Sequence, residues 1–197
     1  MLRVEDKTAM NKWSQYVPDA RHFDAEAIEL GNKVFQETTH VKGSSLLSKG
    51  QICGRLYFIV HGLVYAHTAE GKILWYEWEG RNFTDLESFY NQKASNQFLK
   101  VAEDNTQLIS IGYADLQYLF GKSHQWALWG IRFYQQELQR IAGYYEALRN
   151  KDASERYFEL VAAFPDILQR IPLGHIASYL GISQVSLSRI RAGVQKK

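Results

Sequence analysis

The chain has 197 residues, of which 46% are hydrophobic and 14% aromatic, so it supports one or two compact domains and is not a disordered chain. Its formal net charge of +2 excludes a histone-like polycation or a long acidic tail, although a local basic patch remains compatible with it. A single cysteine, Cys53, excludes an internal disulfide, a zinc site built of cysteines and a four-cysteine iron–sulfur cluster.

The same composition indicates the compartment. Low cysteine usage favours a reducing, cytoplasmic setting. The N-terminal residues MLRVEDKTAM lack the apolar core and cleavage site of a secretory signal. The apolar run LYFIV, residues 56–60, is far shorter than the ~20 residues that a membrane helix needs. We therefore expect a cytoplasmic protein that makes no membrane contact.

The first half of the chain is expected to contain one helix followed by many short strands. Residues 20–37 predict a helix, and Asp24 is placed to cap its start. Residues 44–113 predict about six to eight antiparallel strands, because short β-rich runs alternate there with glycine turns. This number of strands is typical of a sandwich, a jelly roll or a small barrel.

Residues 114–150 contain no proline and few β-branched side chains, which predicts a helical segment. Six apolar residues in it are spaced alternately three and four apart, the pattern of a coiled-coil seam. One interpretation is a helix that packs on the core of its own domain, and the other is a long helix that pairs with its twin in a homodimer. The spacing favours the homodimer. The seam residues are Ile131, Tyr134, Leu138, Ile141, Tyr145 and Leu148.

The last third of the chain contains the strongest motif. Pro172 can open a helix, and Gly181 follows its last apolar residue, where glycine readily adopts the left-handed conformation that ends a helix. Ser183 can cap a second helix, in which Leu187 turns inward, and Ala177 of the first helix is small, as a position that faces a second helix at close range must be. Two helices joined by such a corner predict a helix-turn-helix, which presents its second helix to the major groove of DNA.

The outward residues of that second helix suit DNA. Residues 170–197 contain five Lys or Arg and no Asp or Glu, which gives them a charge of +5 and leaves −3 for residues 1–169. Gln184, Ser188 and Arg189 are predicted to contact base edges, Arg189 a guanine in particular. Phosphate contacts are predicted for Ser183, Ser186 and Arg191, and nonspecific attraction to DNA is expected from the two C-terminal lysines. The predicted DNA-contacting residues are Ser183, Gln184, Val185, Ser186, Ser188, Arg189, Arg191, Lys196 and Lys197.

The chain combines a β-rich part, a seam helix and a helix-turn-helix. In this combination it resembles the Crp/Fnr family of bacterial transcription regulators. The segment KGSSLLSKGQICGRLYFIVHGLV resembles the opening of the family's cyclic-nucleotide-binding β-roll, with Gly43, Gly50 and Gly62 at its turns. The segment IASYLGISQVSLSRIR resembles the family's helix-turn-helix, and the short C-terminal end is similar to that of members found in Bacteroidetes.

The resemblance implies an α+β fold with three parts. These are an antiparallel, jelly-roll-like β-roll with flanking helices as a sensor domain in residues 1–122, a dimerisation helix in residues 123–150, and a small all-α helix-turn-helix domain in residues 151–197. Winged members follow the second helix with a β-hairpin, and residues 192–197 are too few for one, so we expect a domain without a full wing.

The function that the resemblance implies is that of a homodimeric, sequence-specific DNA-binding transcription regulator. Its two half-sites on DNA would lie about 34 Å apart, one helical turn. The candidate partners are double-stranded DNA, a second copy of the chain, RNA polymerase and an unknown small-molecule effector in the β-roll.

The expected ligand site departs from the family pattern. Nucleotide-binding members begin their phosphate-binding cassette with Gly-Glu and close it with an Arg beside a small hydroxyl residue. Here Thr84 and Asp85 stand at the first place and Ser95 and Asn96 at the second, so these four are the candidate ligand residues. None of them is a cation, and a buried phosphate without a paired charge costs several kcal/mol. We therefore expect no cyclic nucleotide and assign no cofactor.

The two other functional classes are an enzyme and an interaction module. An enzyme is not expected, because the chain has no His-x-His metal pair, no G-x-S-x-G elbow, no phosphate loop and no G-x-G-x-x-G fingerprint. No metal site is expected either. A ligand-sensing or protein-interaction module, whose helix-turn-helix binds no specific DNA, stays open as the alternative function.

Overall fold

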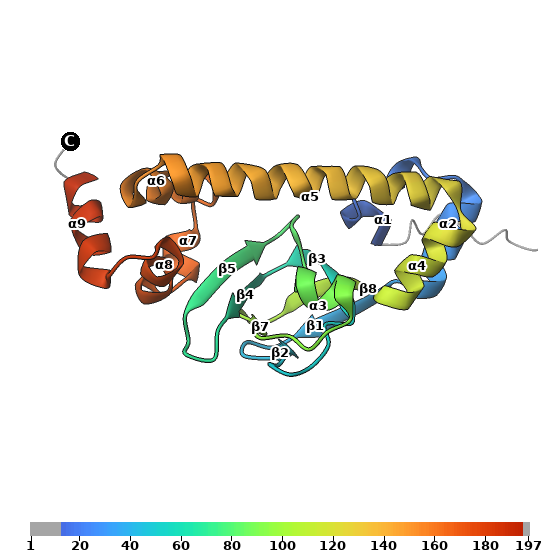
Figure 1. The fold of residues 1–197 in the computed structure, drawn as a ribbon, viewed down its shortest axis with the longest axis horizontal. Helices are drawn as coiled ribbons and strands as arrows, with labels where there is room; N and C mark the ends of the chain where they lie inside the picture. Colours follow the sequence, from blue (N-terminus) through green and yellow to red (C-terminus); the bar gives the residue numbers. More distant parts are fainter. Residues whose placement is uncertain (1–12, 195–197) are drawn as a thin grey trace, which may run out of the picture.

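The computed structural model describes residues 13–194, which form two four-stranded antiparallel sheets, a long helix above them and a helical unit at one end (Figure 1). The strand order is β1-β8-β3-β6 in one sheet and β2-β7-β4-β5 in the other. The predicted fold class, a β-roll with flanking helices, is confirmed. The strands are β1 Gln36–His40, β2 Ser45–Leu47, β3 Arg55–His61, β4 Leu63–His67, β5 Ile73–Trp78, β6 Asn82–Phe83, β7 Phe98–Val101 and β8 Thr106–Gly112.

Helices precede, interrupt and follow the sheets. Within the described residues, none of them is long and apolar enough to cross a membrane. They are α1 Trp13–Tyr16, the 3-10 helix η1 Ala20–His22, α2 Ala25–Val34, α3 Leu86–Asn91, α4 Tyr113–Lys122, α5 His124–Asn150, α6 Ala153–Ala163, α7 Ile167–Arg170, α8 Leu173–Leu180 and α9 Gln184–Val194.

The helix expected over residues 20–37 is too long, because its C-terminal end belongs to a strand. Asp24 caps α2 as predicted, its carboxylate accepting a hydrogen bond from the Ala27 amide at 2.9 Å. Gln36 then begins β1, an edge strand that pairs with β8 alone. Four of the five β1 side chains are exposed, so the strand shows no alternation of apolar and polar residues that the sequence could reveal.

The helical stretch that follows Ala114 is two helices and not one. It breaks at Ser123, whose hydroxyl accepts a hydrogen bond from the Trp126 amide and caps α5. From this cap α5 runs for 27 residues along the whole β-roll (Figure 1).

Trp126 fixes the beginning of α5 to the β-roll and to the N-terminal helices. The ring is fully buried and lies 5.6 Å from Trp13, 4.6 Å from Phe23 and 5.8 Å from Phe35, measured between ring centroids. Its indole nitrogen donates a hydrogen bond to the Ala27 carbonyl at 2.9 Å. Such burial with a satisfied N–H makes tryptophan a strong anchor.

The next two turns of α5 extend this contact. Trp129 donates a hydrogen bond to the Pro18 carbonyl at 2.7 Å, and its ring stacks on Phe133 with centroids 4.9 Å apart. Phe133 in turn contacts Phe58 of β3, 6.2 Å between centroids. One face of the first ten residues of α5, with Trp126, Trp129 and Phe133, is therefore part of the β-roll core.

The C-terminal helices share a second apolar cluster with the β-roll. Leu63, Ile73 and Tyr76 from β4 and β5 pack with buried residues of α6 to α9, among them Ile176 and Leu180 of α8. This cluster joins the predicted sensor and DNA-binding parts, so the division of the chain at residues 122 and 150 stays a prediction.

The Trp126→Ala variant should lower the free energy of unfolding by about 3–5 kcal/mol, because it leaves a large cavity and removes the indole hydrogen bond to the Ala27 carbonyl. Urea unfolding followed by circular dichroism measures the change. Tyr118→Ala removes an exposed aromatic ring of α4 and should cost about 1 kcal/mol or less. Equal losses in the two variants would contradict the anchoring role of Trp126.

Candidate DNA interface and ligand cavity

The corner between α8 and α9 has the predicted geometry. Gly181 has a φ of 71°, in the left-handed region, and the Ile182 amide donates to the Ala177 carbonyl at 3.0 Å. These contacts satisfy the free carbonyls at the end of α8. Ser183 accepts a hydrogen bond from the Ser186 amide at 3.1 Å, which caps α9.

The outward face of α9 carries most of the predicted DNA-contacting residues. Gln184, Ser188 and Arg189 are exposed, and Val185 is 62% exposed, while Leu187 on the opposite face is buried. Figure 1 shows α9 at the outer end of the molecule, away from both sheets. The face is therefore free to enter a groove, and contact with DNA stays a prediction.

The remaining predicted contacts differ in exposure. Ser186 and Arg191 are half-buried, and the Ser186 hydroxyl lies 3.0 Å from that of Ser183. Lys196 and Lys197 lie outside the described residues. The Gln184 side chain lies over Gly174 of α8, where a Cβ atom would come within 2.2 Å of the Gln184 amide nitrogen. Gly174 thus leaves room for this side chain at the corner.

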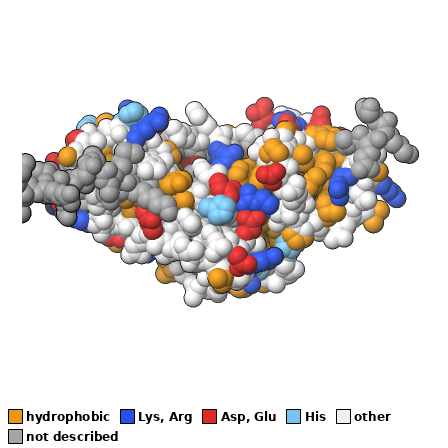
Figure 2. Space-filling view, turned by 180° about the vertical axis from the view of Figure 1, so that it is seen from behind, with side chains coloured by type: hydrophobic (Ala, Val, Ile, Leu, Met, Phe, Trp, Pro, Cys, Tyr) orange, Lys and Arg blue, Asp and Glu red, His pale blue; other side chains and the backbone are white. Residues whose placement is uncertain are grey.

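Arg170 does not belong to the basic face of the helix-turn-helix, although it contributes to the +5 charge of residues 170–197. Its guanidinium binds Glu79 at 2.9 Å and Glu103 at 2.6 Å, both on turns of the β-roll, and His61 lies 3.4 Å from Glu79. Acidic, basic and histidine side chains gather near the middle of the face drawn in Figure 2. The Arg170 charge is therefore neutralised within the chain and holds α7 to the roll.

The seam residues of α5 are largely uncovered. Ile131 is 55% exposed, Leu138 67% and Tyr145 61%, and Leu148 is also exposed, while Tyr134 and Ile141 are half-buried. An isolated exposed leucine is ordinary, but a stripe of them along one helix marks an interaction surface. This stripe favours the homodimer over a helix buried in its own domain.

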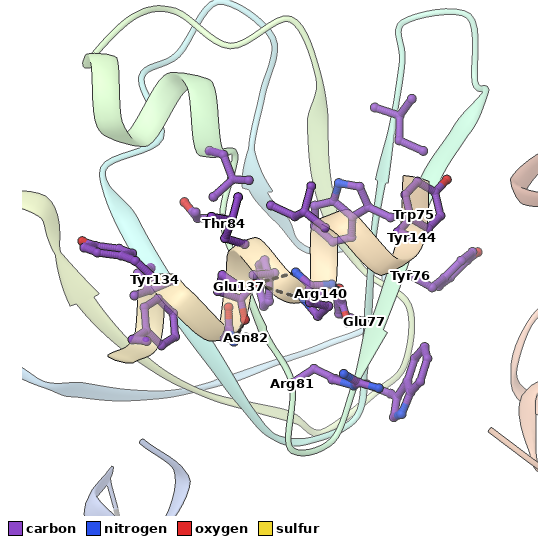
Figure 3. A pocket seen from close by; sticks show the side chains of 18 of the residues that line it. Trp75, Tyr76, Glu77, Arg81, Asn82, Thr84, Tyr134, Glu137, Arg140 and Tyr144 are labelled. Carbon is purple, nitrogen blue, oxygen red and sulfur yellow. Dashed lines mark hydrogen bonds and ion pairs between the residues drawn. The ribbon is translucent and has the colours of Figure 1, made fainter. Parts of the chain in front are cut away.

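A cavity of about 610 Å³ lies between the β-roll and α5. Side chains of β5, β6 and α3 form one side, and α5 forms the other (Figure 3). Tyr179 of α8 also lines the cavity. The lining is mostly aromatic and aliphatic. Tyr134, Leu138, Ile141 and Tyr145 line the cavity and also belong to the predicted seam.

An ion-pair network crosses this cavity. Arg140 of α5 binds Glu77 of β5 at 2.7 Å and Glu137, one turn earlier, at 2.8 Å, and Asn82 donates a hydrogen bond to Glu137 at 3.0 Å. In Figure 3 these four side chains face one another across the gap between strand and helix. Burial raises the pKa of Glu77 to about 7, against the opposing effect of Arg140.

The four candidate ligand residues do not act together at this cavity. Thr84 lines it, but the Thr84 hydroxyl donates to the Arg55 carbonyl at 2.9 Å. Asp85 is buried and caps α3, and its second oxygen accepts a hydrogen bond from the Ser95 hydroxyl at 2.6 Å. Asn96 is exposed. Asp85 and Ser95 therefore bond to each other within the cassette. Of the four candidate ligand residues, only Thr84 lines the space that a ligand could fill.

Sequence reasoning missed Glu77, Arg140 and Tyr179. Glu77 is the charged residue inside the apolar run KILWYEW, and a charge in such a strand is a usable signal for a buried site. Arg140 and Tyr179 carry no comparable signal, because charged residues on a long helix and aromatic residues beside a core are both common.

Solved structures share this fold. FixK2 from Bradyrhizobium japonicum has a TM-score of 0.67 and 17% identity, over 83% of this chain and 85% of its own. A protein from Eubacterium rectale described as a Crp/Fnr-family transcriptional regulator has a TM-score of 0.67 and 14% identity, over 92% and 88%. A CooA variant from Carboxydothermus hydrogenoformans has a TM-score of 0.63 and 19% identity, over 91% and 84%.

No family model and no curated protein match the sequence. These three structural matches nevertheless cover 83–92% of this chain. The chain therefore has the fold of the Crp/Fnr transcription regulators, and the predicted resemblance is confirmed at the level of the fold.

The stability contributed by Glu77 should depend on pH. Because its pKa is higher in the folded chain than the ordinary 4.5, protonated Glu77 favours folding. The unfolding free energy of the wild type, relative to Glu77→Gln, should fall as the pH rises from about 4.5 to about 7 and then level off. Urea unfolding of both proteins at four pH values measures this difference, with Glu146→Gln as the control for an exposed carboxylate of α5. If the unfolding free energy of the wild type relative to Glu77→Gln rose with pH, this would contradict the raised pKa of Glu77.

Proposed function

We propose that this protein is a homodimeric transcription regulator of the Crp/Fnr type that binds a specific DNA sequence through α9. The observation that carries the proposal is the capped, exposed α9, which projects Gln184, Ser188 and Arg189 from a chain with the fold of such regulators. The regulator fold also supports a function other than catalysis.

Dimerisation sets the spacing of the two recognition helices. The stripe of exposed apolar residues on α5 pairs with the same stripe of a second copy, an arrangement that a two-fold axis makes self-complementary. Each α9 then enters one of two successive major grooves, about 34 Å apart, so the operator is a near-palindrome.

Base reading and phosphate contact are divided along α9. Arg189 donates two hydrogen bonds to a guanine, while Gln184 and Ser188 contact neighbouring base edges and Val185 meets a thymine methyl group. Ser183, Ser186, Arg191, Lys196 and Lys197 contact phosphates and fix the register.

The other partners follow from the same fold. A small molecule that binds between the β-roll and α5 acts as effector, and RNA polymerase is the partner through which a DNA-bound dimer changes transcription. The protein acts in the cytoplasm. A cyclic nucleotide is not proposed as effector, because Asp85 and Ser95 satisfy each other and no cation stands among the four cassette residues.

A mobility-shift assay on fragments of the source genome, at two salt concentrations, tests the proposal. Specific binding whose affinity falls steeply with salt supports it, because release of counterions from the phosphates drives association. A dimer that shifts no fragment at either salt concentration would support the alternative, an interaction module without specific DNA binding.

The Arg189→Ala variant should weaken binding to the operator by about 1–3 kcal/mol and relax the preference at one base pair, because a two-hydrogen-bond contact to guanine is lost. Arg149→Ala, an exposed arginine at the end of α5, is the matched control and should leave the preference unchanged. Titration against operators substituted at each position measures both effects. If Arg189→Ala weakened all DNA equally, Arg189 would be a phosphate contact.

The Leu138→Asp variant should be monomeric, because it places a charge in the middle of the proposed seam. Light scattering with size-exclusion chromatography measures the mass. Gln136→Asp adds the same charge to an exposed position of α5 outside the seam and should remain dimeric. A Leu138→Asp protein that is still dimeric would exclude this seam as the interface.

A further inference from the structure

The charges in the cavity between the β-roll and α5 are unfavourable for a phosphate. Two carboxylates, Glu77 and Glu137, line it, and both bind the guanidinium of Arg140. Arg81, the other basic residue among the described lining, is exposed and lies over the Trp78 ring at 5.3 Å. An anion would therefore lie beside Glu137 and, above the Glu77 pKa of about 7, beside a second negative charge on Glu77. Because Arg140 is already shared between them, this arrangement disfavours its binding.

The walls of the cavity favour a flat aromatic molecule. Aromatic rings line it from four elements: Trp75 of β5, Phe83 of β6, Tyr90 of α3, and Tyr134 and Tyr144 of α5. Figure 3 shows Trp75, Tyr134 and Tyr144 among them. Aromatic rings pack well against another ring, stacked or edge to face. The volume of about 610 Å³ falls within the range of small-molecule sites.

The two carboxylates of the cavity can accept a hydrogen bond from an uncharged ligand. Arg140 neutralises part of the acidic charge, and the Thr84 hydroxyl already donates to the Arg55 carbonyl. A carboxylate has more acceptor positions than one arginine fills, so Glu77 and Glu137 keep capacity for a ligand N–H.

We propose that the small molecule which binds in this cavity is a neutral, flat aromatic molecule with an N–H donor and no phosphate. The role as effector site rests on the proposed function, whereas the class of ligand rests on the cavity alone.

Two features connect this ligand to DNA binding. Tyr179 reaches the cavity from α8, the first helix of the helix-turn-helix, so a bound ring contacts the DNA-binding unit directly. Leu138 and Tyr145 belong to both the cavity and the seam, so the same ring also contacts the dimer helix. Occupancy thereby biases the position of α9 relative to its twin.

Two fluorescent probes with one ring skeleton test the class of ligand. N-phenyl-1-naphthylamine is neutral and carries an N–H, and 1-anilinonaphthalene-8-sulfonate adds a negative charge to the same skeleton. The full-length protein should bind the neutral probe at least about tenfold more tightly, with one probe per chain. At a pH above the Glu77 pKa of about 7, the Glu77→Gln variant should narrow this difference, because it removes one of the two carboxylates that oppose the sulfonate.

Matched variants locate the binding. Leu86 is exposed and lines the cavity, so Leu86→Trp should fill it and weaken the neutral probe about tenfold. Ile52→Trp adds the same bulk at an exposed position outside the cavity and should bind the probe as the wild type does. The proposal is overturned if both variants bind the neutral probe equally well, or if the protein prefers the sulfonate probe. It is also overturned if no probe binds because the partner's side chains fill the cavity.

The last measurement separates this inference from the proposed function. Probe binding is measured without DNA, and operator affinity is then measured with and without the neutral probe. A change of about threefold or more that is lost in Tyr179→Leu supports the effector role. If the probe binds as described and changes no DNA affinity, the effector role is overturned. Absence of DNA binding under every condition would contradict the proposed function. The proposed class of ligand would be unaffected, because the probe data test it separately.

Discussion

The burial of one end of α5 in the β-roll is the constraint on which the rest of the structure depends. Trp126 and Trp129 place the first turns of the helix inside the core, and their indole nitrogens bond to carbonyls of the N-terminal segment. A helix held rigidly at one end carries its other end in a fixed direction. That direction places the seam outward, leaves a cavity beside β5 and sets where the C-terminal helices begin.

The C-terminal helices are held to the β-roll by contacts of two kinds. Tyr76 contributes to the shared apolar cluster, and its hydroxyl oxygen lies 2.5 Å from Nδ1 of His175 in α8. Arg170 adds the ion pairs with Glu79 and Glu103. The apolar contacts supply most of the attraction, while the ion pairs, only partly buried, fix the register of one part against the other.

Polar groups decide the chemistry of the sensor part. In the cassette, Asp85 and Ser95 use their hydrogen-bonding capacity on each other and on the start of α3. Across the neighbouring cavity, Glu77 and Arg140 join β5 to α5. The Asp85–Ser95 bond therefore occupies the cassette, and the space that remains for a ligand is lined mostly by apolar and aromatic side chains, with Glu77, Glu137 and Arg140 already paired.

The sequence by itself determined the local elements, because their signals are local: the glycine at 181, the cap at Ser183 and the period of the seam each depend on residues a few positions apart. Together with the resemblance, they predicted the β-roll, the long helix and the helix-turn-helix. Only the tertiary structure decided that β1 is a strand, since its hydrogen bonds come from β8. The same holds for the pairing of Arg170 within the chain and for the cavity, because both bring together residues far apart in the sequence, and no local pattern encodes which distant charges and rings meet.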